Sequence, residues 1–274
     1  MIFPYSVDVP MERMPIANWL LIAVTILGSV MLLSSKDLEH TLVLWRGTEF
    51  RWIQLAGSLI GHADWMHLLG NMAFLFVFGN AINAKLGHVL YLVTYFAIGA
   101  IEGLVWLMLG SSEATLGASG AIMGVIGAFL VMYPRNDISV FYYFSLMYSG
   151  SFDVSAYWVI LMYVCFDVWG LIRGDGAGVN YLAHFTGALA GFGIMWGLLA
   201  ARVVQSDSDE QSLLEVLKEH ATAPRKKKAG AAPKRRKSSG EIEEEAWRSM
   251  PAPSDAPPLP PTNQERPSGG KGRR

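Results

Sequence analysis

The sequence predicts an all-α membrane protein built as a bundle of six transmembrane helices. Of its 274 residues, 52% are hydrophobic and only 16% are charged, which is too apolar for an ordinary soluble domain of this size. Long apolar runs recur through the first 200 residues. Of the 22 Lys and Arg residues, only seven precede residue 201. The charge distribution therefore separates a hydrophobic body from a polar C-terminal tail.

Six apolar runs approach the roughly 20 residues that a membrane-spanning helix needs. They cover residues 19–33, 65–82, 89–109, 118–133, 156–171 and 179–200, and turn or charge signals bound them. The first run lacks the basic flank and small-residue cleavage site of a signal peptide, so we expect it to be retained as a span. The predicted organisation is an N-terminal cytoplasmic segment over 1–16, a six-helix membrane domain over 17–200 and a disordered tail over 201–274.

The distribution of basic residues predicts the orientation of the chain. An even number of spans places both termini on one side, and the strongly basic tail should hold that side in the cytoplasm. Lys85 and Arg135 then also lie inside, whereas Arg173 lies outside as a minor exception. We therefore expect an integral multi-pass protein with cytoplasmic N- and C-termini.

The tail combines a possible amphipathic helix over 210–220 with two basic clusters, an acidic run and a Pro-rich stretch. It cannot bury enough apolar surface to fold alone. A solvated positive-inside anchor is the favoured interpretation of its charge. Binding to anionic lipid headgroups is a second possibility. Nucleic-acid binding is not expected, because no recognition fold accompanies the charge.

The fourth run opens with Gly117-Ala118-Ser119-Gly120, and the sixth run carries His184. The glycines near each residue, which are Gly117, Gly120 and Gly124 around the serine and Gly187 and Gly191 after the histidine, predict close packing of the two helices. Packing alone would explain the serine. A histidine within a span is costly without a partner or a water-filled cavity, however, so it is a functional candidate.

Ser119 and His184 together predict nucleophilic catalysis, because a serine hydroxyl becomes a good nucleophile only when a base such as histidine takes its proton. Two acidic residues, Asp167 and Glu102, lie within spans, but neither has a spacing that assigns it to His184. The prediction is therefore a Ser–His dyad rather than a triad. The single cysteine, Cys165, is expected to serve packing, and no metal site or cofactor is predicted.

An oxyanion site would need hydrogen-bond donors near the nucleophile. His67 and Asn71 are four residues apart at the start of the second run, so they share one helix face. Asn71 offers an NH2 donor and His67 a second one. Interhelical hydrogen bonding would explain Asn71 equally well. His62, taken alone, is an ordinary loop residue.

These motifs resemble the signatures of rhomboid intramembrane serine proteases, and they occur in the same order. They are His62 with His67-x-x-x-Asn71, then Gly117-Ala118-Ser119-Gly120-Ala121-Ile122-Met123-Gly124, then Ala183-His184-x-x-Gly187-x-x-x-Gly191. The resemblance covers roughly residues 10–200, and the segments after the second and fourth runs resemble bacterial members, which implies a bacterial inner-membrane location. It implies a six-helix bundle, a dyad of Ser119 and His184, and an oxyanion site formed by the Ser119 backbone N–H, Asn71 and His67. The implied substrates are single-span membrane proteins cut in or near their spans.

Three positions depart from the family pattern. Gln54 replaces the usual Trp-Arg of the first outer loop, Asn83 replaces an acidic residue, and Met123 replaces an aromatic residue that packs on the histidine. A Met thioether still contacts aromatic rings, so support for His184 should be altered rather than lost.

Two other function classes compete with the protease prediction. A catalytically inactive relative would bind client spans, but such proteins typically lack the serine or the histidine. A small-solute transporter would explain Glu102 and Asp167 within spans. The sequence has neither an internal repeat nor paired broken spans, which argues against the transporter.

Overall fold

The computed structural model describes residues 2–47, 50–145, 148–174, 179–206 and 211–222. The chain forms two compact units, Met1–Ala223 and Pro224–Arg274. The second unit lies outside the described residues, as does most of the predicted tail. Within the tail, the structure describes one helix, α10 (Leu213–Thr222), close to the expected amphipathic segment.

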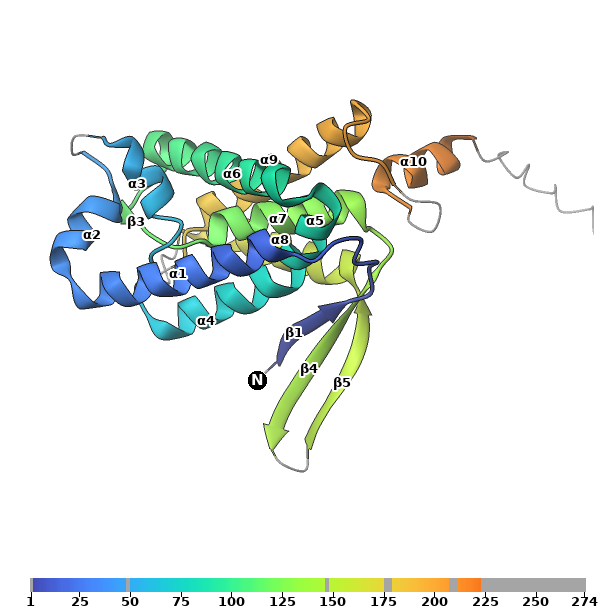
Figure 1. Ribbon diagram of the computed structural model, residues 1–274, viewed down its shortest axis with the longest axis horizontal. Coiled ribbons are helices and arrows are strands. Elements are labelled where there is room, and N and C mark those ends of the chain that lie inside the picture. Colours follow the sequence, from blue (N-terminus) through green and yellow to red (C-terminus); the bar gives the residue numbers. More distant parts are fainter. Residues whose placement is uncertain (1, 48–49, 146–147, 175–178, 207–210, 223–274) are drawn as a thin grey trace, which may run out of the picture. The chain divides into compact units, whose positions relative to one another are not determined.

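The first unit is a bundle of apolar helices, as the sequence predicts (Figure 1). The long helical segments are α1 (Ile16–Ser34), the continuous α4–η1–α5 (Trp65–Phe74, Leu75–Gly79 and Asn80–Leu86), α6 (His88–Leu109), α7 (Ser119–Met132), α8 (Ala156–Arg173) and α9 (Tyr181–Ala200). Two short helices, α2 (Lys36–Leu42) and α3 (Trp52–Gly57), lie between the first two segments. The prediction of a helical membrane bundle is confirmed.

Five of these segments are long and apolar enough to cross a membrane, and α7 is not. With 14 residues, α7 is about 21 Å long, which is shorter than the hydrocarbon core of about 30 Å. Twelve of its residues are buried, so protein surrounds it on nearly all sides. The count of six spans therefore stays a prediction, with α7 as the segment that decides it.

Helices α7 and α9 run parallel and pack backbone against backbone at glycines. A Cβ atom added to Gly187 would lie 2.0 Å from the carbonyl oxygen of Gly120, and one added to Gly191 would lie 1.8 Å from that of Gly124. Both distances are far below any real contact. The two helices approach this closely only because neither carries a side chain at the contact points.

We expect Gly191→Ala to lower the free energy of unfolding by about 3 kcal/mol, because the added methyl group meets rigid backbone. Gly193 provides a matched control on the same helix, since a Cβ atom there has no neighbour within 4 Å. Gly193→Ala should be neutral or slightly stabilising, because Ala favours helix. Thermal unfolding of both variants in detergent micelles tests the packing, and equal stability of the two would contradict it.

The second helical segment contains a π-helical turn, η1, that is held by a buried polar residue on α1. Asn18 donates from Nδ2 to the carbonyl oxygen of Leu75 at 2.9 Å and to Asn80 Oδ1 at 2.8 Å. Its Oδ1 accepts from the hydroxyl of Tyr91 on α6 at 2.5 Å. A π-turn disturbs the regular helical hydrogen bonds, and in an apolar surrounding each freed group needs a partner. Asn18 supplies a partner for the carbonyl oxygen of Leu75, and its hydrogen bonds join α1, the second helical segment and α6.

A three-stranded antiparallel sheet, not predicted from the sequence, lies beside the bundle (Figure 1). It consists of β1 (Ile2–Val7), β4 (Asp137–Ser145) and β5 (Tyr148–Ser155), in the order β1-β4-β5. The N-terminal segment, for which no secondary structure was predicted, pairs with a strand some 130 residues away. On β4, Ile138 and Val140 are buried in alternation, which fits a strand with one covered face.

Candidate active site

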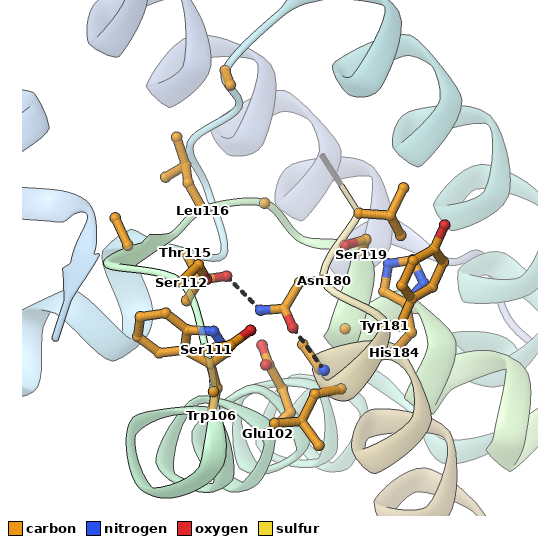
Figure 2. Close-up of a pocket in the computed structure, with 18 of the residues that line it drawn as sticks. Glu102, Trp106, Ser111, Ser112, Thr115, Leu116, Ser119, Asn180, Tyr181 and His184 are labelled. Carbon is orange, nitrogen blue, oxygen red and sulfur yellow. Dashed lines mark hydrogen bonds between the residues drawn. The ribbon is translucent and has the colours of Figure 1, made fainter. Parts of the chain in front are cut away.

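A cavity of about 890 Å³ opens between the helices and is lined by all four predicted active-site residues. Ser119 enters from α7, His184 from α9, and His67 and Asn71 from α4. Figure 2 shows Ser119 and His184 at the same side of this cavity. The structure thus brings together residues from three helices that are far apart in sequence.

The loop before α7 fixes the position of Ser119. Its strand β3 (Ala114–Thr115) pairs with β2 (Leu44–Trp45), and the N–H of Gly117 donates to the carbonyl oxygen of Ser58 at 2.8 Å. Gly117 has a φ of +128°, and a Cβ atom there would lie 2.9 Å from the ring of His67. Gly117 was grouped with the helix-packing glycines, but the structure places it in this loop, where it gives the chain room to pass the imidazole.

Ser119 is the first residue of α7, so its backbone N–H is one of those that a helix leaves without an intrahelical partner. The first regular bond of this helix runs from the N–H of Ile122 to the carbonyl oxygen of Ala118, at 2.9 Å. The N-terminal end of the helix dipole adds partial positive charge at the same place. This end of α7 therefore suits an anion that forms beside the serine.

His184 lies one turn into α9, at the level of Ser119. Gly187 of α9 packs against Gly120 of α7. His184 lies about one turn before Gly187, and Ser119 directly precedes Gly120. Both residues therefore lie at the same end of this helix pair. No hydrogen bond joins Ser119 to His184, both of which the structure describes. Such contacts often tighten only when substrate binds.

A residue that the sequence analysis did not single out, Asn180, holds the start of α9. Its Oδ1 accepts from the N–H of Ala183 at 3.1 Å, which caps the helix. Its Nδ2 donates to Thr115 Oγ1 at 2.8 Å, in the loop before α7 (Figure 2). An asparagine directly before an apolar helical run is a recognisable capping signal. Asn180 thus connects the segment that carries the serine to the helix that carries the histidine.

Asp167 on α8 is the acidic partner that the sequence analysis did not assign. Its Oδ1 lies 3.0 Å from His184 Nδ1, and its side chain is only 9% exposed. The sequence spacing assigned no acidic residue to His184, and the structure corrects this by placing Asp167 within hydrogen-bond distance of the ring. The arrangement leaves His184 Nε2 as the ring nitrogen that is free to face the serine.

Asn71 is held by a chain of hydrogen bonds through His62. Asn71 Nδ2 lies 2.7 Å from His62 Nε2, and His62 Nδ1 lies 2.9 Å from Ser29 Oγ. The serine hydroxyl donates to the carbonyl oxygen of Thr25 at 2.8 Å, so it accepts from His62 Nδ1–H. His62 Nε2 then accepts from the Asn71 amide, which leaves the second amide hydrogen of Asn71 for the cavity. His62 is thus a positioning residue, although alone in the sequence it looked ordinary.

The buried His62 predicts a pH dependence of stability. Burial, and to a smaller extent the neighbouring His67, lowers the pKa of His62 from 6.5 to about 4. The folded protein therefore binds fewer protons than the unfolded chain between pH 6.5 and 4. As the pH falls through this range, His62 should reduce the free energy of unfolding by about 3 kcal/mol in total.

Thermal unfolding of wild type and His62→Gln in detergent, measured from pH 7 to pH 4, tests this prediction. The glutamine cannot take up the proton, so its melting temperature should depend less on pH than that of wild type. Identical pH slopes for the two proteins would show that His62 does not contribute.

The pattern of residues 49–201 matches the family model described as the Rhomboid domain. This match covers more than half of the chain. The chain belongs to the rhomboid family.

Curated relatives support the same assignment. The chain is 27% identical over 161 residues to the Rhomboid-like protein 11, chloroplastic, of Arabidopsis thaliana, covering 58% of this chain and 56% of that protein. It is 26% identical over 164 residues to the Putative rhomboid protease YdcA of Bacillus subtilis, covering 56% of this chain and 75% of that protein. It is also 26% identical over 152 residues to the Rhomboid protease GlpG of Haemophilus influenzae, covering 56% and 71%. The match therefore spans little more than half of the Arabidopsis protein.

Proposed function

We propose that this rhomboid family member is an intramembrane serine endopeptidase that cuts other membrane proteins within or near their spans. The observation that carries the proposal is the meeting of Ser119, His184, His67 and Asn71 at one cavity, with Asp167 bound to the histidine. Relatives named rhomboid proteases support it. A protein that merely binds client spans would not need this set of residues at one place.

In the proposed mechanism, Ser119 Oγ attacks the carbonyl carbon of the scissile peptide bond while His184 Nε2 takes the hydroxyl proton. Asp167 keeps the Nδ1 proton in place and stabilises the imidazolium ion that forms. The oxyanion receives hydrogen bonds from the Ser119 N–H, the free amide hydrogen of Asn71 and His67. His184 then gives its proton to the leaving amine, and the peptide bond breaks. A water molecule hydrolyses the ester by the same steps.

The short α7 explains how water reaches a reaction site within the membrane domain. If its C-terminal end lies near one membrane surface, a helix of about 21 Å leaves Ser119 roughly 9 Å below the other surface. Irregular backbone at such a depth is tolerated only where protein or a water-filled cavity surrounds it. The loop that precedes Ser119 lines the cavity and meets this condition.

Reconstitution tests the proposed function. The purified chain, placed in lipid vesicles with a panel of single-span substrates, should cut at least one of them at a bond within or next to its span. Mass spectrometry of both products locates that bond. The same vesicles with added metal chelator should retain the activity, because every proposed step uses only groups of the protein and water. Failure to cut any member of a broad panel would count against the proposal.

We further propose that both termini are cytoplasmic and that the cavity opens on the opposite side. The support is the basic composition of the chain after residue 200. Single cysteines at Ser111, which lines the cavity, and at Ser239 test this in a Cys165→Ala background. A membrane-impermeant thiol reagent applied to intact cells should label only the cysteine at position 111. Labelling at 239 alone would invert the orientation.

A further inference from the structure

Glu102 on α6 has a carboxyl group that faces the active-site cavity without a partner. The residue is only 5% exposed, and within the described part of the chain it makes no hydrogen bond or ion pair. Figure 2 shows the carboxyl group at the cavity together with Ser119. A Cβ atom on Gly120 would lie 2.8 Å from the Glu102 carboxyl carbon, so the carboxyl group lies directly beside the residue that follows the nucleophile.

The lining of the cavity is acidic. Besides Glu102, the acidic residues Glu39 and Asp64 line it. Asp64 is engaged as the cap of α4, where it accepts from the N–H of His67 at 2.8 Å. Neither Lys nor Arg occurs among the described residues that line the cavity, and its bases are His67 and His184. The cavity therefore favours a cationic guest.

A carboxylate in this position has two costs that a cation would remove. Removing a charged group from water without a partner is unfavourable. A negative charge beside Gly120 also repels the oxyanion that would form next to Ser119, and water screens such repulsion poorly in a buried site. Packing alone does not require an acid here, because a glutamine would fill the same space. A positively charged side chain on the substrate would pair with Glu102 and relieve the repulsion.

We propose that Glu102 binds a basic side chain, Lys or Arg, of the substrate segment that lies across the active site. This inference rests on the proposed protease function and specifies its substrate class. Because Gly120 directly follows Ser119, and an extended chain advances about 3.4 Å per residue, the basic residue lies roughly one or two positions from the cleaved bond. The position of Glu102 is compatible with a basic residue on either side of the cleaved bond.

The test compares substrates that differ at one position. A cleaved single-span substrate is prepared with Lys or with Met at each of the two positions on either side of the bond, and kcat/KM is measured for each. Wild type should prefer Lys over Met by about 10- to 100-fold at one of these positions, as expected for a charge-assisted hydrogen bond. Glu102→Gln should lose this preference and should cut the Met substrate at least as fast as wild type does.

Glu39→Gln is the matched control, because it removes a negative charge from the same cavity but not from beside Gly120. Glu39→Gln should keep the preference for Lys over Met. If Glu39→Gln lost this preference, the role of Glu102 would be overturned. Equal rates for Lys and Met in wild type would also overturn the inference, even if Glu102→Gln does not fold. An equal loss for both substrates in Glu102→Gln would indicate a structural role and overturn it too.

The failure of this inference is distinguishable from failure of the proposed function. Cleavage that depends on Ser119 but shows no preference for Lys overturns the inference alone. No Ser119-dependent cleavage of any substrate overturns both.

Discussion

Ser119→Ala and His184→Ala should each reduce cleavage of a single-span substrate by at least about 10⁴-fold, to the background rate. The nucleophile and its base act as one unit, so either loss removes the covalent pathway. The double variant should therefore be no slower than either single variant. Initial rates in lipid vesicles, followed by the appearance of both products, provide the measurement.

Ser112→Ala is the control for this pair, because Ser112 lines the same cavity as Ser119 (Figure 2). It should retain most of the activity. The two serine variants should show the wild-type melting temperature within a few degrees, since removing the half-buried hydroxyl of Ser119 or the exposed one of Ser112 costs little packing. Substantial turnover by well-folded Ser119→Ala would refute the assignment of the nucleophile.

Asp167→Ala should lower kcat by about 10- to 1000-fold and change KM little. The carboxylate stabilises the imidazolium ion that exists only after the proton has moved, so its loss affects the transition state rather than substrate binding. Asp167→Asn should lower kcat about as much as Asp167→Ala, because the amide carries no charge and its NH2 group can donate to His184 Nδ1 and hold the ring in the wrong tautomer. Steady-state kinetics on one substrate give both constants.

Asp153→Asn serves as the control, since this carboxylate lies on β5 and binds the hydroxyl of Ser139 at 2.7 Å. It should leave kcat unchanged. If Asp167→Ala raised KM and left kcat unaltered, Asp167 would act in substrate binding, and the proposed positioning of His184 would be incorrect.

Most of the helical fold could be predicted from the sequence, because membrane spans have a strong local signal. The run of apolar residues and its flanking charges are enough to place a helix within a few residues, as with α6 and α9. The four-residue spacing of His67 and Asn71 likewise predicts one face of α4, and both residues line the cavity. Such inferences succeed because each rests on residues that are close in sequence.

The remaining features depend on contacts between distant segments. Asp167 reaches His184 because α8 and α9 pack side by side, and no spacing along either helix shows which faces meet. The pairing of β1 with β4 is equally non-local. Gly117 resembles the glycines that follow it, and only its positive φ and its contact with His67 separate a loop residue from a helix-packing one.

Labelling by a biotinylated fluorophosphonate tests the central claim, that Ser119 is a nucleophile activated by His184. This reagent bonds only to a serine whose proton is taken by a base. Applied at neutral pH to the folded chain in lipid vesicles, it should modify Ser119, as located by mass spectrometry of the labelled peptide. Ser112→Ala should be labelled like wild type, and His184→Ala should not be labelled. Labelling that persists in Ser119→Ala, or folded wild type that cuts substrate without being labelled, would contradict this account.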